Sequence, residues 1–516
     1  MLFGLDNWRN WHNISRMNSQ LTTSELKTEG DIRFLTFNVN GIRTFFHYAP
    51  FSEMRQSLKQ VFDWFGADII TFQELKTETL SLTKWGKVDG FYSFISIPQH
   101  KKGYSGVGCW VRIPDEDDPM FPMLRVVKAE EGITGLLTIK TGKTVTRYRD
   151  DPSLGIGGYC PIDSFPDNID EATALRIDSE GRCVLVELGC GIVVISLYCP
   201  ANSSCTEEGE LFRMRFLRLL FLRVKNLQQM GKHVVLMGDL NICRDLIDHA
   251  VTLDENNISI NADTTGKLVD EKYYELCSNF IINPDFPHRK LLNEQITDSL
   301  VPELRNPNGL IDSTRKIQGR DRLKMYTVWN TLKNMRPNNY GSRIDFILIN
   351  EAIGSTITKA NILPEINGSD HCPVYCDIDM KAYNHLNPCS LDDSDYKLPR
   401  FEARYKYNLQ NRNIFDMFSK SGSTAKSVKV TKKVPSRHSK QEESMKGILL
   451  KKASSMRASP FFNDTFGKPP MCKHGEVAIL KTSKTSNNPG KKFWTCARPR
   501  GDSNDKEASC GFFQWV

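Results

Sequence analysis

Short apolar runs recur through the first 380 residues of the chain, and polar or turn-forming residues bound each of them. Their length and their β-branched residues predict buried strands. The expected strands are residues 32–39, 68–72, 107–111, 183–188, 192–198, 233–237, 344–349 and 374–378. Gly189-Cys190-Gly191 lies between two of these runs and predicts a hairpin turn.

Helical periodicity appears between the strands. One face of a predicted helix carries apolar residues at helical spacing, namely Met54, Leu58, Val61, Phe62 and Phe65. A longer helix is expected over residues 207–229. Strands that alternate with helices predict an α/β sandwich with mixed sheets inside and helices outside. Residues 128–178 hold few apolar runs, and we expect them to leave the core.

Composition divides the 516 residues into four parts. Residues 1–30 lack a period and are expected to form a tail, whereas residues 31–380 carry the predicted strands and helices. Residues 381–460 predict a basic disordered linker, because their Lys-, Ser- and Thr-rich part cannot bury a core. Residues 461–516 contain several aromatic residues and predict a small separate module.

Net charge and cysteine content indicate which partners and which cellular compartment to expect. The formal net charge of +7 favours a polyanionic partner without proving one. No run reaches the roughly 18 apolar residues of a membrane span, so no membrane partner is expected. Fourteen cysteines without a secretory signal favour a reducing compartment over a disulfide framework.

Short polar motifs stand at the ends of the apolar runs, spread over residues 38–371. They are Asn38-Val39-Asn40-Gly41, Gln73-Glu74, Tyr198 with Asn202, Gly238-Asp239-Leu240-Asn241, Ser342-Arg343-Ile344-Asp345 and Gly368-Ser369-Asp370-His371. One carboxylate, amide or imidazole at each strand end can gather a divalent metal and a polarised water around a phosphate.

The residue types in these motifs suit phosphodiester hydrolysis. Glu74 follows a strand and offers hard oxygen ligands for Mg²⁺. Asp239 and Asn241 have the spacing of side chains on one side of a strand end. Asp345 lies inside a predicted strand, where an ionised carboxylate needs a partner, and His371 is the obvious one. Each motif alone also fits a turn, a helix cap or an edge residue, but their joint occurrence favours a site.

Together these motifs resemble the exonuclease III class of abasic-site endonucleases, within the endonuclease/exonuclease/phosphatase superfamily. The resemblance covers about residues 31–380 and includes Gly103-Tyr104-Ser105-Gly106, Glu180-Gly181-Arg182 and Tyr326-Thr327-Val328-Trp329. It implies a four-layered α/β sandwich that acts on DNA with Mg²⁺ (or Mn²⁺) as cofactor.

The resemblance also implies roles for individual residues. The implied metal ligands, or residues close to a metal, are Asn38, Glu74, Asp239, Asn241, Asp345, Asp370 and His371. The implied catalytic contacts to phosphate or water come from Tyr198, Asn202, Asp239, Asn241 and His371, with Asp239 as the favoured base. The implied DNA contacts are Arg43, Lys76, Tyr104, Trp329 and Arg343.

One position departs from the main branch of this family. That branch often has an aromatic residue immediately before its Arg-x-Asp motif, where it helps to wall the pocket for a baseless sugar. Here the position is Ser342. The eukaryotic type 2 branch is similar at this point and favours trimming of 3′ ends, so we expect looser discrimination for an internal abasic site.

The C-terminal module has the ligand types of a structural zinc site. Cys472, His474, Cys496 and Cys510 supply four thiolate or imidazole groups. The flanking sequence resembles the GRF-type zinc finger of type 2 abasic endonucleases, although Phe512 replaces its usual arginine. Basic and aromatic residues suit single-stranded DNA, and the expected contacts are Lys491, Lys492 and Trp494.

Two segments of the linker suggest partners and location. Residues 411–418, from Asn411 to Phe418, resemble a degenerate box for the sliding clamp PCNA, although an amphipathic turn also fits. Residues 429–440 fit a nuclear import signal, with solvated disorder as the alternative. Arg9 and Arg16 give the tail a weak resemblance to a mitochondrial transit peptide, and Met17 is an alternative start.

The expected function is therefore a nuclear, monomeric DNA-repair nuclease of base excision repair. We expect it to hydrolyse phosphodiesters at abasic sites and at 3′ ends, as a 3′–5′ exonuclease and 3′-phosphodiesterase. A phosphatase or deadenylase of the same superfamily is one alternative. A non-catalytic scaffold that binds single-stranded DNA is another, although the chain retains the expected catalytic residues.

Overall fold

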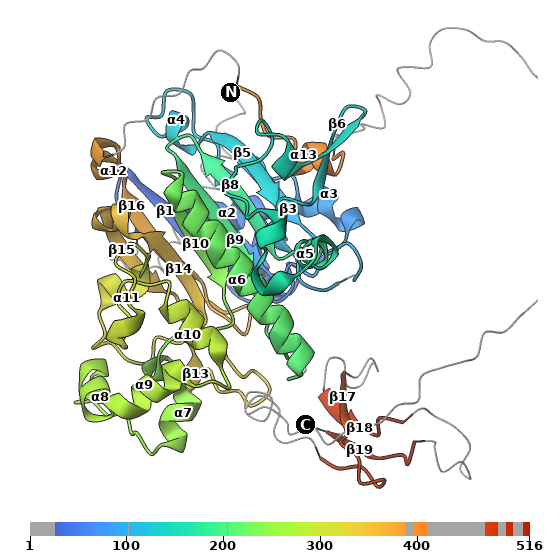
Figure 1. The fold of residues 1–516 in the computed structure, drawn as a ribbon, viewed down its shortest axis with the longest axis vertical. Coiled ribbons are helices and arrows are strands. Elements are labelled where there is room, and N and C mark those ends of the chain that lie inside the picture. Colours follow the sequence, from blue (N-terminus) through green and yellow to red (C-terminus); the bar gives the residue numbers. More distant parts are fainter. Residues whose placement is uncertain are drawn as a thin grey trace, which may run out of the picture.

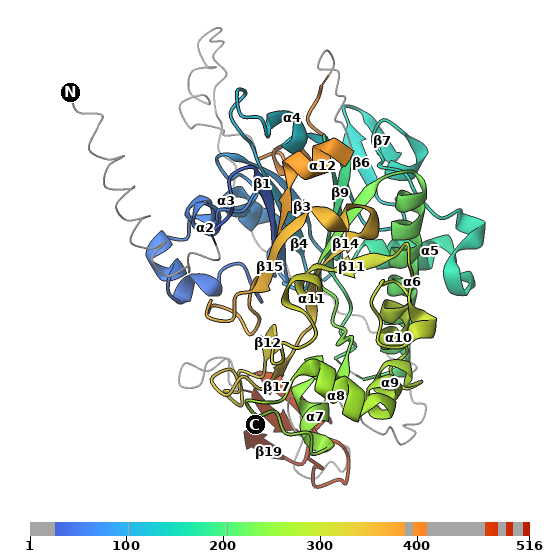
Figure 2. The same cartoon turned by 90° about the vertical axis from the view of Figure 1, so that its left-hand side faces the viewer.

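The computed structural model describes residues 26–101, 103–203, 205–386, 396–409, 470–482, 492–498 and 509–515. Two six-stranded sheets lie at the centre of the larger unit (Figures 1 and 2). The first has the order β15 (Ile357–Ile362), β16 (Val374–Asp379), β1 (Asp31–Asn38), β2 (Ile69–Gln73), β4 (Val107–Arg112), β3 (Phe91–Ser96). The second has the order β11 (Leu310–Asp312), β14 (Asp345–Asn350), β10 (His233–Asp239), β9 (Ile192–Tyr198), β8 (Cys183–Leu188), β5 (Val126–Glu131).

The central strands, such as β8, β9 and β14, are buried on both faces, which explains their continuous apolar sequence. In β8, Val184 and Val186 point into the core between the two sheets, whereas Leu185 points to the core under the helices. This alternation is the period of two expected of a strand. A third apolar core, which includes Phe62 and Trp110, lies on the outer face of the first sheet. The order helix, sheet, sheet, helix confirms the predicted four-layered α/β sandwich.

Helices cover the outer faces. The second sheet is covered by α6 (Glu207–Gln229), which Figure 1 shows running along it, together with α5 (Glu171–Asp178) and α10 (Pro287–Asn293). The first sheet is covered by α2 (Leu58–Phe65), α3 (Leu82–Trp85) and α13 (Ala403–Lys406). The other α-helices in the described part of the chain are α4 (Phe121–Leu124), α7 (Ala250–Glu255), α8 (Gly266–Lys272), α9 (Tyr274–Ile282), α11 (Ser313–Gln318) and α12 (Met380–Leu386).

Two small sheets and the C-terminal module complete the described structure. One hairpin pairs β6 (Thr138–Thr141) with β7 (Thr144–Arg147), and another pairs β12 (Val328–Trp329) with β13 (Gly341–Ser342). The module contains a three-stranded antiparallel sheet of β17 (Ile479–Thr482), β18 (Lys492–Thr495) and β19 (Phe513–Trp515). None of the helices among these described residues has the length and apolar character to cross a membrane.

Most of the expected elements are present. The strands expected at residues 183–188 and 192–198 have these bounds as β8 and β9, and the helix expected at 207–229 is α6. The predicted Gly189-Cys190-Gly191 turn joins the antiparallel pair β8 and β9. The sequence patterns missed β3, β5, β11 and β15 within the two main sheets.

Two expectations about organisation were wrong. Residues 128–178 do not leave the core as a whole, because β5 belongs to the second sheet and α5 packs against it. The larger unit also extends past residue 380. Phe401, Ala403 and Leu409 are buried in its cores, and Lys406 forms a 2.6 Å ion pair with Glu131. The expected clamp box at residues 411–418 lies outside the described residues.

Candidate active site

The sheet topology brings the expected site residues together. Parallel pairing of β1 with β2 places Asn38 beside Gln73, which directly precedes Glu74. In the second sheet, Asp239 at the end of β10 pairs with Tyr198 on one side and with Asp345 on the other. The chain can pass close at this point because Gly238 lacks a side chain: an added Cβ would lie 2.0 Å from the carbonyl oxygen of Leu197.

Asn38 lies at the centre of the polar cluster and is fully buried. Its Nδ2 donates to Glu74 Oε1 at 2.9 Å and to Asp239 Oδ2 at 2.9 Å. The same nitrogen lies 3.4 Å from His371 Nε2. Its Oδ1 accepts a hydrogen bond from the backbone N–H of Asn40 at 3.0 Å. One amide therefore joins groups from the two sheets and from the His371 loop.

Three of these residues have the ligand types and spacing of a metal site. Glu74, Asp239 and His371 each offer one ligand atom, and the three atoms lie within 4.8 Å of one another. Two carboxylates are the hard oxygen ligands that Mg²⁺ or Mn²⁺ takes. In addition, Asp345 Oδ1 is buried beside the cluster without a hydrogen-bond partner among the described residues. The donor set therefore fits a divalent cation.

The expected Asp345–His371 pair is formed. His371 Nδ1 lies 2.8 Å from Asp345 Oδ2, and both side chains are buried. His371 Nε2 faces Asp239 Oδ2 at 4.0 Å. Burial opposes the charged imidazole, but the Asp345 and Asp239 carboxylates outweigh it and raise the pKa of His371 to about 10. The imidazole is therefore held in one orientation as a cation. In this form its Nε2 carries a proton and is not free to bind a metal, so Glu74 and Asp239 are the ligands that remain.

The carboxylates of the cluster differ in their protonation. Burial, and then the nearby Asp345 carboxylate, raises the pKa of Asp239 to about 8. Burial also acts on Glu74, but the Lys76 ammonium, 2.7 Å from Glu74 Oε2, leaves the pKa of Glu74 below its usual value. A divalent cation among these oxygens would favour the ionised form of Asp239.

Asn241 and Tyr198 flank Asp239. The backbone N–H of Asn241 donates to Asp239 Oδ1 at 2.8 Å, and its Nδ2 donates to the carbonyl oxygen of Cys199 at 2.9 Å. The guanidinium of Arg182 lies 4.9 Å from the ring centroid of Tyr198 and 5.1 Å from that of Tyr104. Burial raises the pKa of the Tyr198 phenol well above its usual value, which keeps it a hydrogen-bond donor.

Other expected site residues lie at the rim of the cluster. Asp370 is half-buried and accepts a hydrogen bond from Asn40 Nδ2 at 2.8 Å. Lys76 donates to the Oδ1 of the same Asn40 as well as to Glu74. Arg43 is exposed and donates to Ser81 Oγ at 2.6 Å. Asn40 joins this network although no role was predicted for it; its place in the Asn38-Val39-Asn40-Gly41 motif was the available signal.

The structure does not support a phosphate contact from Asn202. Its Nδ2 donates to the carbonyl oxygen of Thr206 and to Glu210 Oε2, both at 3.2 Å. Its Oδ1 accepts the backbone N–H of Thr206 at 3.3 Å. Both ends of the amide are therefore engaged at the N-terminus of α6.

Two expected DNA contacts are buried and need correction. Arg343 is 1% exposed and donates to Asp248 at 2.7 Å and lies 2.8 Å from Asp312. Trp329 is 3% exposed, and its Nε1 donates to Asn339 Oδ1 at 3.0 Å. Neither side chain presents a surface to DNA in this structure. Both instead support the loops around the cluster.

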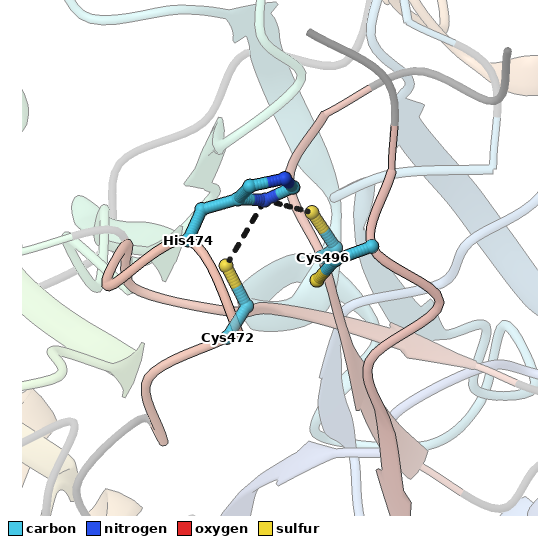
Figure 3. Close-up of side chains that lie close together, drawn as sticks. Cys472, His474 and Cys496 are labelled. Carbon is cyan, nitrogen blue, oxygen red and sulfur yellow. Dashed lines mark hydrogen bonds between the residues drawn. The ribbon is translucent and has the colours of Figure 1, made fainter. Parts of the chain in front are cut away.

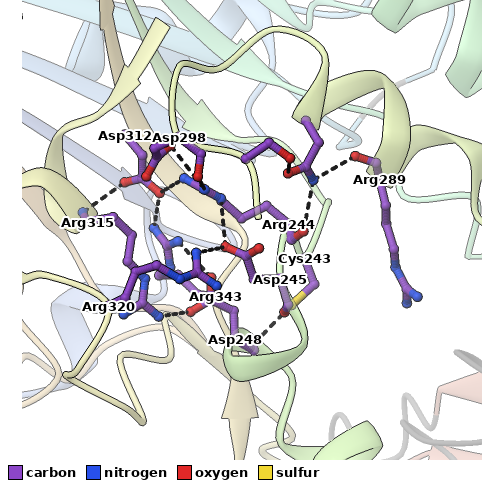
Figure 4. Close-up of polar contacts among 12 residues, drawn as sticks. Cys243, Arg244, Asp245, Asp248, Arg289, Asp298, Asp312, Arg315, Arg320 and Arg343 are labelled. Carbon is purple, nitrogen blue, oxygen red and sulfur yellow. Dashed lines mark hydrogen bonds and ion pairs between the residues drawn. The ribbon is translucent and has the colours of Figure 1, made fainter. Parts of the chain in front are cut away.

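Arg343 belongs to a buried network of ion pairs close to the site (Figure 4). The charged residues that form it are Arg244, Asp245, Asp248, Asp270, Asp312, Arg315, Arg320 and Arg343, and Asp298 joins Arg244 at its exposed edge. Arginine and aspartate alternate, so each buried charge lies beside an opposite one. Removing one partner would leave an uncompensated buried charge, which is why such networks are sensitive to single substitutions.

The C-terminal module contains the expected metal-binding residues. Cys472, His474, Cys496 and Cys510 each offer a ligand atom, and these atoms lie within 4.8 Å of one another. His474 Nδ1 lies 3.7 Å from Cys472 Sγ and 3.5 Å from Cys496 Sγ, as the converging side chains in Figure 3 show. Four soft or imidazole ligands with no further open position suit a structural Zn²⁺.

The aromatic residues of the module differ from the expectation. Trp494, expected to stack on bases, is 3% exposed. The strand register instead places Phe493, Phe513 and Trp515 on one face of the small sheet, with ring centroids 4.8–5.6 Å apart. Phe513 is 51% and Trp515 is 43% exposed. Lys492 is half-buried in β18, and Lys491 lies outside the described residues.

Comparison with known proteins agrees with both units. The model of the Endonuclease/Exonuclease/phosphatase family matches residues 35–371. The chain belongs to this family. The GRF zinc finger model matches residues 470–516, which contain all four metal-binding residues.

Relatives that match over their whole length show which branch of the family the chain resembles. The chain is 56% identical to the Saccharomyces cerevisiae protein named DNA-(apurinic or apyrimidinic site) endonuclease 2, over 96% of this chain and 99% of that protein. It is 26% identical to the human protein of the same name, over 94% and 99% of the two chains. The crystal structure of the Xenopus laevis APE2 catalytic domain is similar with a TM-score of 0.51 at 26% identity, and the match covers 72% of this chain and 97% of that one. The expected type 2 branch is thereby confirmed.

Proposed function

We propose that this DNA-repair nuclease hydrolyses phosphodiesters at abasic sites and at 3′ ends with the help of Mg²⁺. The observation that carries the proposal is the buried cluster of Asn38, Glu74, Asp239 and His371, with Asp345 behind His371. Such a cluster has the groups that phosphodiester hydrolysis needs: ligands for a cation, an acceptor for the proton of water, and donors for the phosphate oxygens. The whole-length relatives support DNA as the substrate.

In this proposal, Glu74 and Asp239 would hold the cation, with Asn38 close by. The cation, when bound, would neutralise charge that develops on the phosphate. Asp239 and Asn241 orient the attacking water, and Asp239 accepts its proton. The cationic His371, oriented by Asp345, donates to a non-bridging phosphate oxygen. The Tyr198 phenol serves as a second donor.

Ser342 bears on which substrate is preferred. It is 9% exposed in the short β13 strand, where the main branch of the family often has an aromatic wall. A serine hydroxyl supplies little surface to pack against a baseless sugar. We therefore propose that 3′ ends, through 3′–5′ exonuclease and 3′-phosphodiesterase action, are cleaved at rates comparable to or above those of internal abasic sites.

The C-terminal finger is proposed to bind single-stranded DNA with Zn²⁺ as a structural ion. Phe493, Phe513 and Trp515 offer an aromatic face for base stacking. Exposed Lys481 lies opposite Phe493 in the register and supplies a cation for phosphate. We also propose action as a monomer in the nucleus, with the sliding clamp PCNA as a partner through residues 411–418.

The decisive experiment is cleavage by the purified full-length protein with and without Mg²⁺. The three substrates are duplexes with an internal abasic site, a recessed 3′ end and a 3′-phosphoglycolate. An Asp239→Asn variant controls for contaminating nucleases. Cleavage that requires both Mg²⁺ and Asp239 supports the proposal. Hydrolysis of inositol phosphates or poly(A) without DNA cleavage would favour the phosphatase or deadenylase alternative, and DNA binding without any cleavage would favour the scaffold.

A further inference from the structure

Arg336 makes an unusual set of contacts beside the active site. It lies between β12 and β13, in the surface loop of residues 330–340. Its Nη1 donates to the carbonyl oxygens of Ser369 at 2.9 Å and His371 at 3.4 Å. Its Nη2 donates to the carbonyl oxygens of Pro364 at 2.9 Å and Ile366 at 2.6 Å. One guanidinium therefore joins four backbone carbonyls of residues 364–371.

Trp329 holds the guanidinium from one face. The Arg336 Cζ lies 4.5 Å from the centroid of the Trp329 ring, a cation–π distance. Trp329 is fixed in turn, because its Nε1 donates to Asn339 Oδ1 and its backbone N–H donates to the carbonyl oxygen of Asp370, both at 3.0 Å. The stack thus touches the same segment that Arg336 binds. This explains why Trp329 is buried and does not face DNA.

The segment that Arg336 binds carries a site residue at its end. Residues 364–371 form no regular strand or helix, apart from the single bridge of His371 with Val328. Because no strand or helix pairs most of their carbonyl groups, these groups are available to side-chain donors such as Arg336. A planar guanidinium can serve several carbonyls at once, whereas a lysine ammonium on a flexible stem cannot reproduce that geometry.

We propose that Arg336 is a positioning residue for His371. It fixes the backbone on which the imidazole is mounted, while Asp345 fixes the ring itself. Arg336 does not reach the cluster of Asn38, Glu74 and Asp239 through any contact seen among the described residues, so it acts through the 364–371 segment. The inference rests on the proposed function, since it assumes that His371 contacts the phosphate in the reaction.

The test compares three full-length variants with the wild type on a recessed 3′ end. Arg336→Met removes the donors and Arg336→Lys keeps the charge. Arg149→Met is the matched control, because Arg149 also donates to two carbonyl oxygens and lies over aromatic rings. These contacts are to Thr134, Cys160, Tyr159 and Phe165, none of which belongs to the site. Single-turnover rates, KM for DNA and the thermal unfolding midpoint are measured for each.

Arg336→Met should lower the single-turnover rate about 10- to 100-fold, the effect expected when a reacting group is displaced by a fraction of an ångström to one ångström. KM should change far less, and Arg336→Lys should recover part of the rate. Arg149→Met should keep the wild-type rate even where its unfolding midpoint falls as much. A wild-type rate for folded Arg336→Met, or equal losses in Arg336→Met and Arg149→Met, would overturn the inference.

A second comparison separates positioning of His371 from a general defect. In a His371→Ala background, adding Arg336→Met should change the residual rate less than about twofold, because groups that act as one unit are not additive. A further loss as large as in the wild-type background would show that Arg336 acts elsewhere. If the wild type cleaves none of the three DNA substrates, the proposed function itself fails, which is a different outcome.

Discussion

Asp345 and His371 contact each other at 2.8 Å, and the same Asp345 pairs in register with Asp239 in the neighbouring strand. The imidazole therefore lies between two carboxylates, one behind it and one in front. Burying either carboxylate in its ionised form would cost free energy if it had no partner. The protonated imidazole of His371 lies beside both carboxylates and offsets that cost. Asp345 and His371 therefore act as one functional unit, in which the imidazole keeps its positive charge.

This relationship predicts strongly non-additive kinetics. Asp345→Ala frees the imidazole to rotate, and His371→Ala removes it, so each should lower the cleavage rate by a large and similar factor. The double variant should be no more than about threefold slower than the slower single variant. Single-turnover cleavage of all three variants checks this. Losses that multiply would mean that the two side chains act independently.

Glu74 should govern the metal requirement. Glu74→Gln keeps the size of the side chain and can still accept from Asn38, but it removes a charge from the ligand set. We expect at least about a 100-fold loss of activity at limiting Mg²⁺, partly restored at high Mg²⁺. A titration of rate against Mg²⁺ concentration measures this. Glu78→Gln, outside the cluster, is the control, and a wild-type Mg²⁺ curve for Glu74→Gln would remove Glu74 from the ligands.

Sequence patterns could predict the central strands because burial on both faces makes them continuous apolar runs, as in β9 and β10. They missed β15 because its polar positions, such as Lys359, interrupt the run at the edge of the sheet. Motifs could predict Glu74, Asp239 and His371, since these residues stand at strand ends. The burial of Arg343 in ion pairs could not be predicted, because its partners Asp248 and Asp312 lie far away in sequence. For the same reason nothing in the sequence indicated that Arg336 would serve the His371 segment.

His249 should make stability depend on pH. Its Nδ1 accepts the backbone N–H of Thr252 as the N-cap of α7, and burial, followed by the nearby Arg289, lowers the pKa of His249 to about 3. The unfolded chain, with an ordinary histidine pKa, binds this proton at higher pH than the folded chain. Stability is therefore present at neutral pH and is lost as pH falls below the unfolded value. From pH 7 to pH 5 the loss from this group should be about 2 kcal/mol.

The variant His249→Asn keeps a capping acceptor that does not titrate in this range. Urea unfolding of wild type and variant at pH 7 and pH 5 gives the difference in stability at each pH. The wild type should lose stability relative to His249→Asn as the pH falls. A pH-independent difference for His249→Asn would contradict the buried-cap argument.

Arg343 should matter for stability and not for DNA binding. Arg343→Met leaves Asp248 and Asp312 with less compensation in a buried site, so the free energy of unfolding should fall by about 3–5 kcal/mol. Arg43→Met, at an exposed expected DNA contact, should instead weaken DNA binding and reduce its salt dependence with little effect on unfolding. Unfolding curves and binding titrations at two salt concentrations distinguish the two. If a folded Arg343→Met variant binds DNA more weakly, Arg343 contacts DNA after all.

The finger offers the sharpest contrast between neighbouring aromatic residues. Phe513→Ala and Trp515→Ala remove exposed rings from the aromatic face and should weaken binding of single-stranded DNA by about 1–3 kcal/mol per stacked base. Trp494→Ala removes a buried ring, so it should instead disturb the fold of the module and release Zn²⁺ more readily. Electrophoretic shifts with single-stranded oligonucleotides and a chelator titration measure the two effects.

Removal of residues 461–516 should abolish the binding that Phe513 and Trp515 provide while cleavage chemistry continues, since the cluster around Asp239 ends at His371. Equal affinity of the full-length and shortened proteins for single-stranded DNA would contradict the proposal that the finger binds it. A protein ligand for the aromatic face would then be favoured.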